Sequence, residues 1–183
     1  MTQGQAVHLA DELRLGLRGQ VRRVLAPRGV KVRQVVQLRY EWRYLLLAVD
    51  PQAGALRWTW LERLSQDHLR TVLADWELDC VIWDGAGSHR GKRLRDLPTT
   101  RVLLPPYAPE LNPAERVFQE VRRVAEGVRY KTLDAKQAVV DRCLRGLAAS
   151  PERVRQLCGW TWLCDALALL PAPPTSDSST PPF

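Results

Sequence analysis

Three acidic residues stand where an apolar run ends, where a helix begins, or inside an expected strand. Asp84 directly follows the apolar run CVIW at 80–83, and Gly85 leaves its carboxylate uncrowded. Glu115 falls in the first turn of an expected helix, and Asp11 lies in an expected N-terminal strand. Carboxylate oxygens are the ligands that a hard cation such as Mg²⁺ prefers. These three residues are therefore candidates for metal-ion chemistry.

Two of these acids also have an ordinary structural explanation. An Asp before a Gly is common turn chemistry, which would account for Asp84. Asn112, Pro113 and Glu115 have the spacing of an N-cap, N1 and N3. In that arrangement Glu115 would complete a capping box and offset the helix dipole.

Asp11 has two acidic competitors. Glu12 follows it directly, and because successive residues of a strand point to opposite faces, only one of the pair can join a given site. Asp50 lies in the string DPQAG, where turn geometry fully explains an Asp. The residues alone therefore favour structure at Asp50 and leave Asp11 open.

The sequence lacks several motifs that define other enzyme classes. It contains no GxxxxGK[ST], GxGxxG, HExxH or GxSxG string. Nucleoside triphosphate, dinucleotide, zinc-protease and serine-hydrolase functions therefore have no support.

The elements that would position the acids follow from apolar patterns. Strands are expected at 7–17, 35–38, 42–49, 55–61, 80–83 and 101–104, with helices over 65–76 and from residues 112, 132 and 150. Three early antiparallel strands followed by alternating helices and strands predict an α/β fold with a mixed sheet flanked by helices. One domain over 1–170 is expected, and the Pro- and Ser-rich segment 171–183 is expected to be a disordered tail.

Arginine dominates the positive charge. The chain has 27 basic and 20 acidic residues, a net charge of +7. Arginine matches phosphate geometry, so the excess favours a nucleic-acid partner, although arginine-rich codon usage or a solvated surface would also explain it. Candidates for contacts with the DNA backbone lie in a basic turn between strands: Arg18, Arg22, Arg23, Arg28 and Lys31.

Cysteine usage and hydropathy bear on the compartment. The four cysteines form no CxxC pair and have no histidine at ligand spacing, which favours free thiols in a reducing cytoplasm. No uninterrupted apolar span long enough for a membrane helix occurs, so no membrane partner is expected.

Two long strings resemble the catalytic core of DDE transposases of the mariner-like superfamily, particularly its bacterial insertion-sequence branch. They are IWDGAGSH and LLPPYAPELNPAERVFQEV, and LADELRLGLRGQVRRVLAPRG looks like the family's first catalytic strand and the basic region after it. The resemblance spans roughly residues 7–165. It implies a ribonuclease H-like fold, a DNA substrate, and two Mg²⁺ ions, with Mn²⁺ as an alternative, bound by Asp11, Asp84 and Glu115.

Three further residues become candidates for contacts with DNA. His89 matches a histidine common in the family and would contact a phosphate or a nearby water; a surface loop histidine is the alternative. Gln119 and Arg122 share the polar side of their helix with Glu115, by the rotation of 100° per residue. A plain solvated face explains Gln119 and Arg122 equally well.

The resemblance also sets expectations about partners. Relatives carry an N-terminal helix-turn-helix region that reads the element's ends, and this chain resembles the catalytic half alone. We expect DNA strand cleavage and strand transfer, with a separately encoded helix-turn-helix half and a homodimer as candidate partners. The alternative is a truncated or domesticated copy that binds DNA or regulates a full-length transposase without cutting. A ribonuclease H-type repair nuclease is a weaker alternative.

Overall fold

A mixed five-stranded sheet organises the chain. The computed structural model describes residues 6–19, 25–33, 36–106 and 108–170. The strand order is β3-β2-β1-β4-β5, where β1 to β3 pair antiparallel and β4 and β5 continue parallel to β1. The strands are β1 (Val7–Gly16), β2 (Trp42–Asp50), β3 (Ala55–Leu61), β4 (Cys80–Trp83) and β5 (Thr100–Leu103). The predicted α/β fold with a mixed sheet is confirmed.

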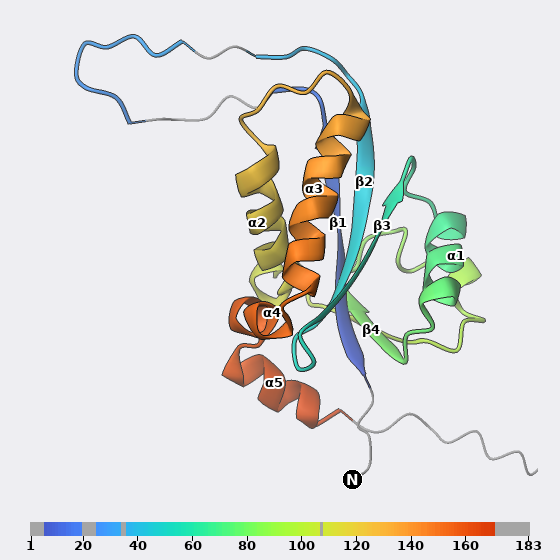
Figure 1. Ribbon diagram of the computed structural model, residues 1–183. Helices are drawn as coiled ribbons and strands as arrows, with labels where there is room; N and C mark the ends of the chain where they lie inside the picture. Colours follow the sequence, from blue (N-terminus) through green and yellow to red (C-terminus); the bar gives the residue numbers. More distant parts are fainter. Residues whose placement is uncertain (1–5, 20–24, 34–35, 107, 171–183) are drawn as a thin grey trace, which may run out of the picture.

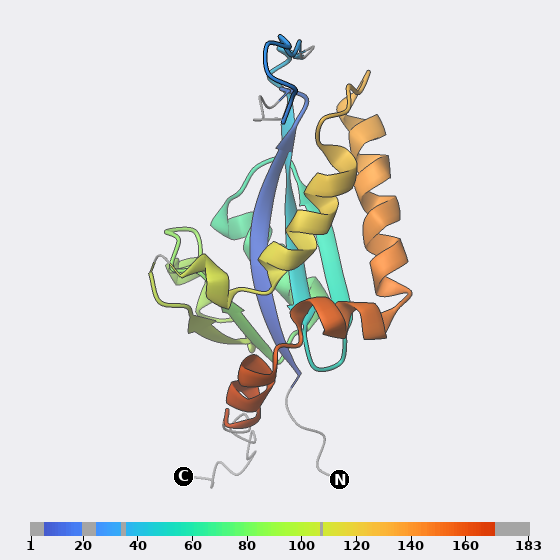
Figure 2. The same ribbon diagram turned by 90° about the vertical axis from the view of Figure 1, so that its left-hand side faces the viewer.

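Helices cover both faces of the sheet. They are α1 (Gln66–Trp76), α2 (Ala114–Ala125), α3 (Leu133–Ala148), α4 (Pro151–Cys158) and α5 (Thr161–Ala168), with short 3-10 turns at Lys92–Leu94 and Pro109–Leu111. Figures 1 and 2 show α2, α3 and α4 on one side of the strands and α1 on the other. Between the two layers, the strands bury apolar side chains on both faces.

Helix caps and the turn between β2 and β3 form as their residue types dictate. Ser65 and Thr132 accept hydrogen bonds from backbone N–H groups in the first turns of α1 and α3. Asp50 accepts from the N–H groups of Gln52 and Ala53, and Gly54 supplies the positive φ of 71° that ends the turn. Asp50 is therefore a turn residue of the β2–β3 hairpin, as predicted.

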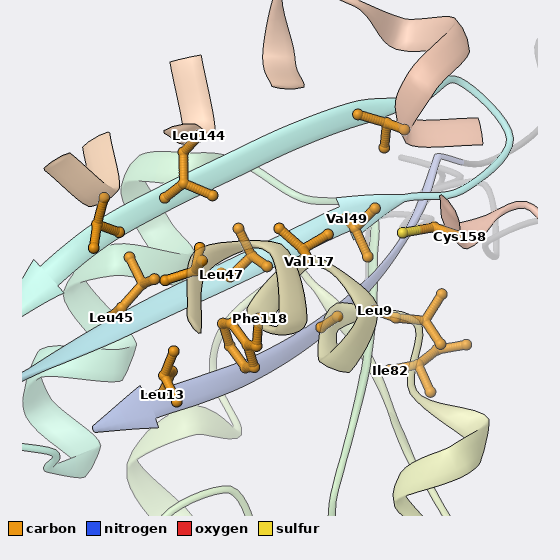
Figure 3. Packing of buried hydrophobic residues seen from close by; sticks show 14 of the residues in the cluster. Leu9, Leu13, Leu45, Leu47, Val49, Ile82, Val117, Phe118, Leu144 and Cys158 are labelled. Atoms are coloured by element: carbon orange, nitrogen blue, oxygen red, sulfur yellow. The ribbon is translucent and has the colours of Figure 1, made fainter. Parts of the chain in front are cut away.

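One core cluster fixes α2 on the sheet. Val117 and Phe118 of α2 are fully buried against Leu9 of β1 and Leu47 of β2 (Figure 3). Val124, in the last turn of α2, lies at the edge of this apolar stripe and is 41% exposed. The buried stripe sets the rotation of α2, and with it the side on which Glu115 projects.

Two elements differ from the sequence-based expectation. The segment 35–38 was expected to be a strand, but the described residues 36–41 are irregular and β2 begins at Trp42. Leu38 and Tyr40 are exposed there, so burial gives no reason for regular pairing. Helix α5 was not predicted. Among the described residues no helix is both long and apolar enough to cross a membrane, and the expected tail at 171–183 lies outside the described residues.

Candidate active site

Strand pairing brings Asp11 and Asp84 side by side. The parallel register of β1 and β4 places Leu9 opposite Ile82, and both belong to the core under α2. Two residues further along each chain come Asp11 and Asp84. Because strand side chains alternate with a period of two, both aspartates fall on the α2 side of the sheet.

Asn112 brings the third acid to the same place. Its side-chain amide donates to the carbonyl oxygen of Ala10 at 2.9 Å, and its Oδ1 accepts from the N–H of Ala114 at 3.1 Å. The first bond ties the start of α2 to the middle of β1, and the second caps the helix. Glu115, in the first turn, is thereby held beside β1.

Asp11, Asp84 and Glu115 line one cavity of about 460 Å³. The loop that leads from β5 to α2 supplies much of its wall through Pro105, Pro106 and Pro109. Fixed proline φ angles give this loop a defined course, which supports the position of Glu115. The cavity thus contains the three acids that the sequence singled out.

One carboxylate oxygen of Asp84 and one of Glu115 already have a partner within the protein. Asp84 Oδ1 accepts from the N–H of Ala86 at 3.0 Å, and Glu115 Oε2 lies 3.1 Å from an Arg122 guanidinium nitrogen. The predicted capping box is therefore only half formed: Asn112 caps the helix, but the Glu115 carboxylate pairs with Arg122.

Asp11 is the most strongly perturbed acid of the site. The pKa of Asp11 is raised from 3.8 to about 7, mainly by burial and also by the charges of Glu12, Glu115 and Asp84, against a lowering effect of the hydrogen bond from the Glu12 N–H. The cavity therefore holds a carboxylate whose ionisation is opposed by its acidic neighbours. A bound cation would reverse that balance.

The donor set fits a divalent cation of the Mg²⁺ type. All three candidate ligands offer carboxylate oxygens, which hard cations prefer, and their mutual repulsion at Asp11 is what a positive ion would relieve. In the described part of the chain, no group of three His, Cys, Asp or Glu side chains is already close enough together to hold an ion. The assignment of Asp11, Asp84 and Glu115 as ligands stays a prediction.

The raised pKa of Asp11 predicts a pH-dependent effect of Asp11→Asn without metal. Between pH 4 and 7 the folded chain binds more protons at this residue than the unfolded chain, so the free energy of unfolding falls as pH rises through that window. Asparagine removes this effect. We expect Asp11→Asn to stabilise the protein by about 2 kcal/mol more at pH 8 than at pH 5.

Urea denaturation with EDTA at the two pH values would measure this difference. Asp165→Asn, at an exposed position of α5, serves as the control for a generic change in charge. An equal effect of Asp11→Asn at pH 5 and pH 8 would contradict the prediction.

His89 is buried next to Asp84. It is 2% exposed, stacks on the Trp83 ring at a centroid distance of 4.2 Å, and directs both ring nitrogens at protein oxygens. Burial lowers the pKa of His89, but the hydrogen bond and charge of Glu12, together with Asp84, raise it above the ordinary value. Both ring nitrogens thus have protein partners, which speaks against a direct contact with a DNA phosphate, and a role of His89 toward a phosphate or a nearby water stays a prediction.

The other predicted contacts with DNA fall into two regions. Gln119 and Arg122 line a second cavity that shares Glu115 with the first, so they flank the acids. Arg18, Arg28 and Lys31 are exposed in the segment between β1 and β2, which extends away from the sheet (Figure 1). The two remaining candidates lie outside the described residues: Arg22 and Arg23.

Sequence reasoning missed two features of the site. Arg90 lines the cavity of the three acids and is exposed, which makes it a further candidate for a phosphate contact. Asn112 was assigned only as a helix cap, and its bond to Ala10 joins residues 102 positions apart. Its neighbours in sequence gave no sign of that second bond.

A mixed sheet with helices on both faces is the architecture of ribonuclease H-like domains, and here three acids line a cavity where β1, β4 and α2 meet. The sequence of residues 6–136 matches the family described as DDE superfamily endonuclease. The chain therefore belongs to this family. No curated protein sequence matches it.

Solved structures of a mariner transposase share the fold. The Mos1 transposase paired-end complex with left transposon end has a TM-score of 0.61 and 14% identity, covering 86% of this chain and 56% of that chain. A pre-cleavage Mos1 transpososome has a TM-score of 0.62 and 13% identity, and the match covers 85% of this chain and 55% of that chain. The Mos1 mariner paired-end complex with Mn has a TM-score of 0.61 and 14% identity, and the match covers 84% of this chain and 55% of that chain. The chain thus spans about half the length of these transposases, and at this identity the likeness concerns the fold alone.

Proposed function

We propose that this chain is the catalytic domain of an insertion-sequence transposase, which cleaves DNA strands and joins the ends to a target. The observation that carries the proposal is that Asp11, Asp84 and Glu115, from two strands and a helix, line one cavity. Membership of the DDE superfamily endonuclease family supports a nuclease. The Mos1 complexes with transposon ends and with Mn and Mg support DNA and divalent ions as its ligands.

The side chains around the cavity would divide the work of cleavage. Asp11, Asp84 and Glu115 would hold two divalent ions, Mg²⁺ with Mn²⁺ as a substitute. When bound, such ions activate an attacking water and stabilise the leaving oxygen of an in-line displacement. Arg122 and Arg90 would face the phosphates of the strand, where arginine forms bidentate contacts.

DNA binding would involve a wider surface than the cavity. Arg18, Arg28 and Lys31, with Arg22 and Arg23, would contact the DNA backbone, and each contact would steepen the salt dependence of binding by about one unit or less. Reading of the element's ends would fall to a helix-turn-helix half encoded separately, and the active form would be a homodimer. Free thiols at all four cysteines fit a reducing cytoplasm.

A cleavage assay tests the proposal. Purified chain, supplied with its helix-turn-helix half, is incubated with labelled DNA that carries the element's ends, with Mg²⁺, with Mn²⁺ and with EDTA. We expect strand cleavage with either metal and none with EDTA. Binding of the DNA without cleavage under every condition would refute the nuclease and favour a truncated or domesticated copy that acts by binding.

A further inference from the structure

A buried histidine bridges two carboxylates that lie on opposite faces of the sheet. His89 Nε2 is 2.9 Å from Glu12 Oε1, while His89 Nδ1 is 2.6 Å from Asp84 Oδ1 and 3.0 Å from the Asp84 carbonyl oxygen. Glu12 and Asp84 are thus joined through one imidazole ring. Asp84 lines the cavity, whereas Glu12 and His89 do not.

The imidazole is held on several sides. The His89 ring stacks on Trp83 with an angle of 9° between the planes, and the His89 backbone N–H donates to the carbonyl oxygen of Ala86 at 2.9 Å. The side chains of His89 and Glu12 are 1% and 9% exposed. The hydrogen bond between His89 and Glu12 offsets the cost of burying these two polar side chains. The ring therefore has little freedom to turn.

This arrangement determines which oxygen of Asp84 faces the cavity. Asp84 Oδ1 accepts a hydrogen bond from the Ala86 N–H and lies in ion-pair contact with the His89 ring, 2.6 Å from Nδ1. Asp84 Oδ2 has no hydrogen-bond partner elsewhere in the part of the chain that the structure describes. Rotation of the carboxylate would break the Ala86 hydrogen bond and the close contact with His89, so Oδ2 is the oxygen left for a ligand.

Glu12 also acts on Asp11 through its backbone. The Glu12 N–H donates to Asp11 Oδ1 at 2.8 Å, while its side chain reaches Asp84 by way of His89. One residue, on the face of β1 opposite to the cavity, is thus linked to two of the three acids.

We propose that Glu12 and His89 are positioning residues that orient the Asp84 carboxylate for a divalent cation. The inference rests on the proposed metal-dependent function, and it assigns a role in metal binding to Glu12, the acid next to Asp11. Groups that hold metal ligands in this way commonly change metal affinity by a factor of about 10 to 100 when they are removed.

Mn²⁺ titration of the full chain by calorimetry tests the inference without any need for cleavage. Glu12→Ala and His89→Ala are each expected to weaken Mn²⁺ binding about 10-fold or more, and the double variant little further, because both act through the same contact. Glu12→Gln is expected to bind within a few-fold of wild type, since an amide can either accept from Nε2 or donate to it. His68→Ala, at an exposed histidine of α1, is the control.

The possible outcomes separate the inference from the proposed function. Unchanged Mn²⁺ affinity in folded Glu12→Ala, with normal binding by wild type, would overturn the positioning role alone. A wild-type chain that binds no Mn²⁺ would refute both. Should the alanine variants fail to fold, the Mn²⁺ affinities of Glu12→Gln and His89→Gln decide. Affinities equal to that of wild type in both variants would show that the positioning role is wrong. Weaker Mn²⁺ binding by His89→Gln than by Glu12→Gln would support it.

Discussion

Glu115→Gln is expected to reduce the rate of strand cleavage about a thousand-fold. The substitution keeps the shape of the side chain but removes the negative charge that would bind a divalent ion. Loss of one such ligand removes about 4 kcal/mol of transition-state stabilisation, which corresponds to three powers of ten in rate. Single-turnover cleavage of end-bearing DNA with Mn²⁺, in the presence of the helix-turn-helix half, would measure it.

Folding should be almost unaffected by this change. The Glu115 and Arg122 side chains are each about one third exposed (34% and 35%), so loss of their ion pair costs less than about 1 kcal/mol. Glu120→Gln is a matched control, because Glu120 lies on the same helix, pairs with Arg123 at 2.8 Å, and does not line the cavity. Cleavage by Glu115→Gln within tenfold of that by Glu120→Gln would show that Glu115 is no metal ligand.

The positions of Asp84 and Glu115 in the fold could be predicted because local signals define them. A four-residue apolar run is the signature of a strand buried on both faces, and the acid after it must emerge at the strand's carboxyl end. Asn, Pro and Glu at N-cap spacing likewise define a helix start without reference to the rest of the chain. Both signals depend on neighbours within a few residues.

Contacts between distant segments could not be predicted in the same way. Glu12 and His89 are 77 positions apart, and their hydrogen bond depends on the parallel pairing of β1 with β4. The alternation of strand side chains correctly placed Glu12 on the face opposite Asp11, but it gave no information on what Glu12 meets there. His89 was accordingly expected at a phosphate or a nearby water, or else on a surface loop, because a loop histidine after a polar turn has no local sign of burial.

The segment between β1 and β2 also differs from what its composition predicts. Residues 35–38 have the β-branched and aliphatic composition of a strand, yet the described residues 36–38 are irregular, with Val36 and Gln37 half-buried and Leu38 exposed. Composition reports what a residue would favour if a partner strand and a core were present. Gln37 and Glu41 each accept one backbone hydrogen bond from the chain just after β1, but Leu38 and Tyr40 stay exposed, so the strand preference is not reinforced by burial.

Phe118→Ala is expected to be the most damaging single truncation in α2. Phe118 is fully buried (0% exposed) in the cluster that fixes this helix on the sheet (Figure 3). Removing its ring loses apolar burial and leaves a cavity, which together cost about 3–5 kcal/mol. Urea denaturation followed by tryptophan fluorescence would show a fall of that size in the free energy of unfolding.

Val124→Ala gives the comparison, because Val124 belongs to the same helix but is 41% exposed. We expect a cost of less than about 1 kcal/mol there, since surface substitutions have small effects. Equal costs at the two positions would contradict the packing described for α2. Phe118 also lies one turn after Glu115, and the Arg122 guanidinium sits 5.9 Å from its ring centroid. Folded Phe118→Ala should therefore bind Mn²⁺ more weakly than Val124→Ala, because the same side chain that stabilises the helix supports the carboxylate and its partner.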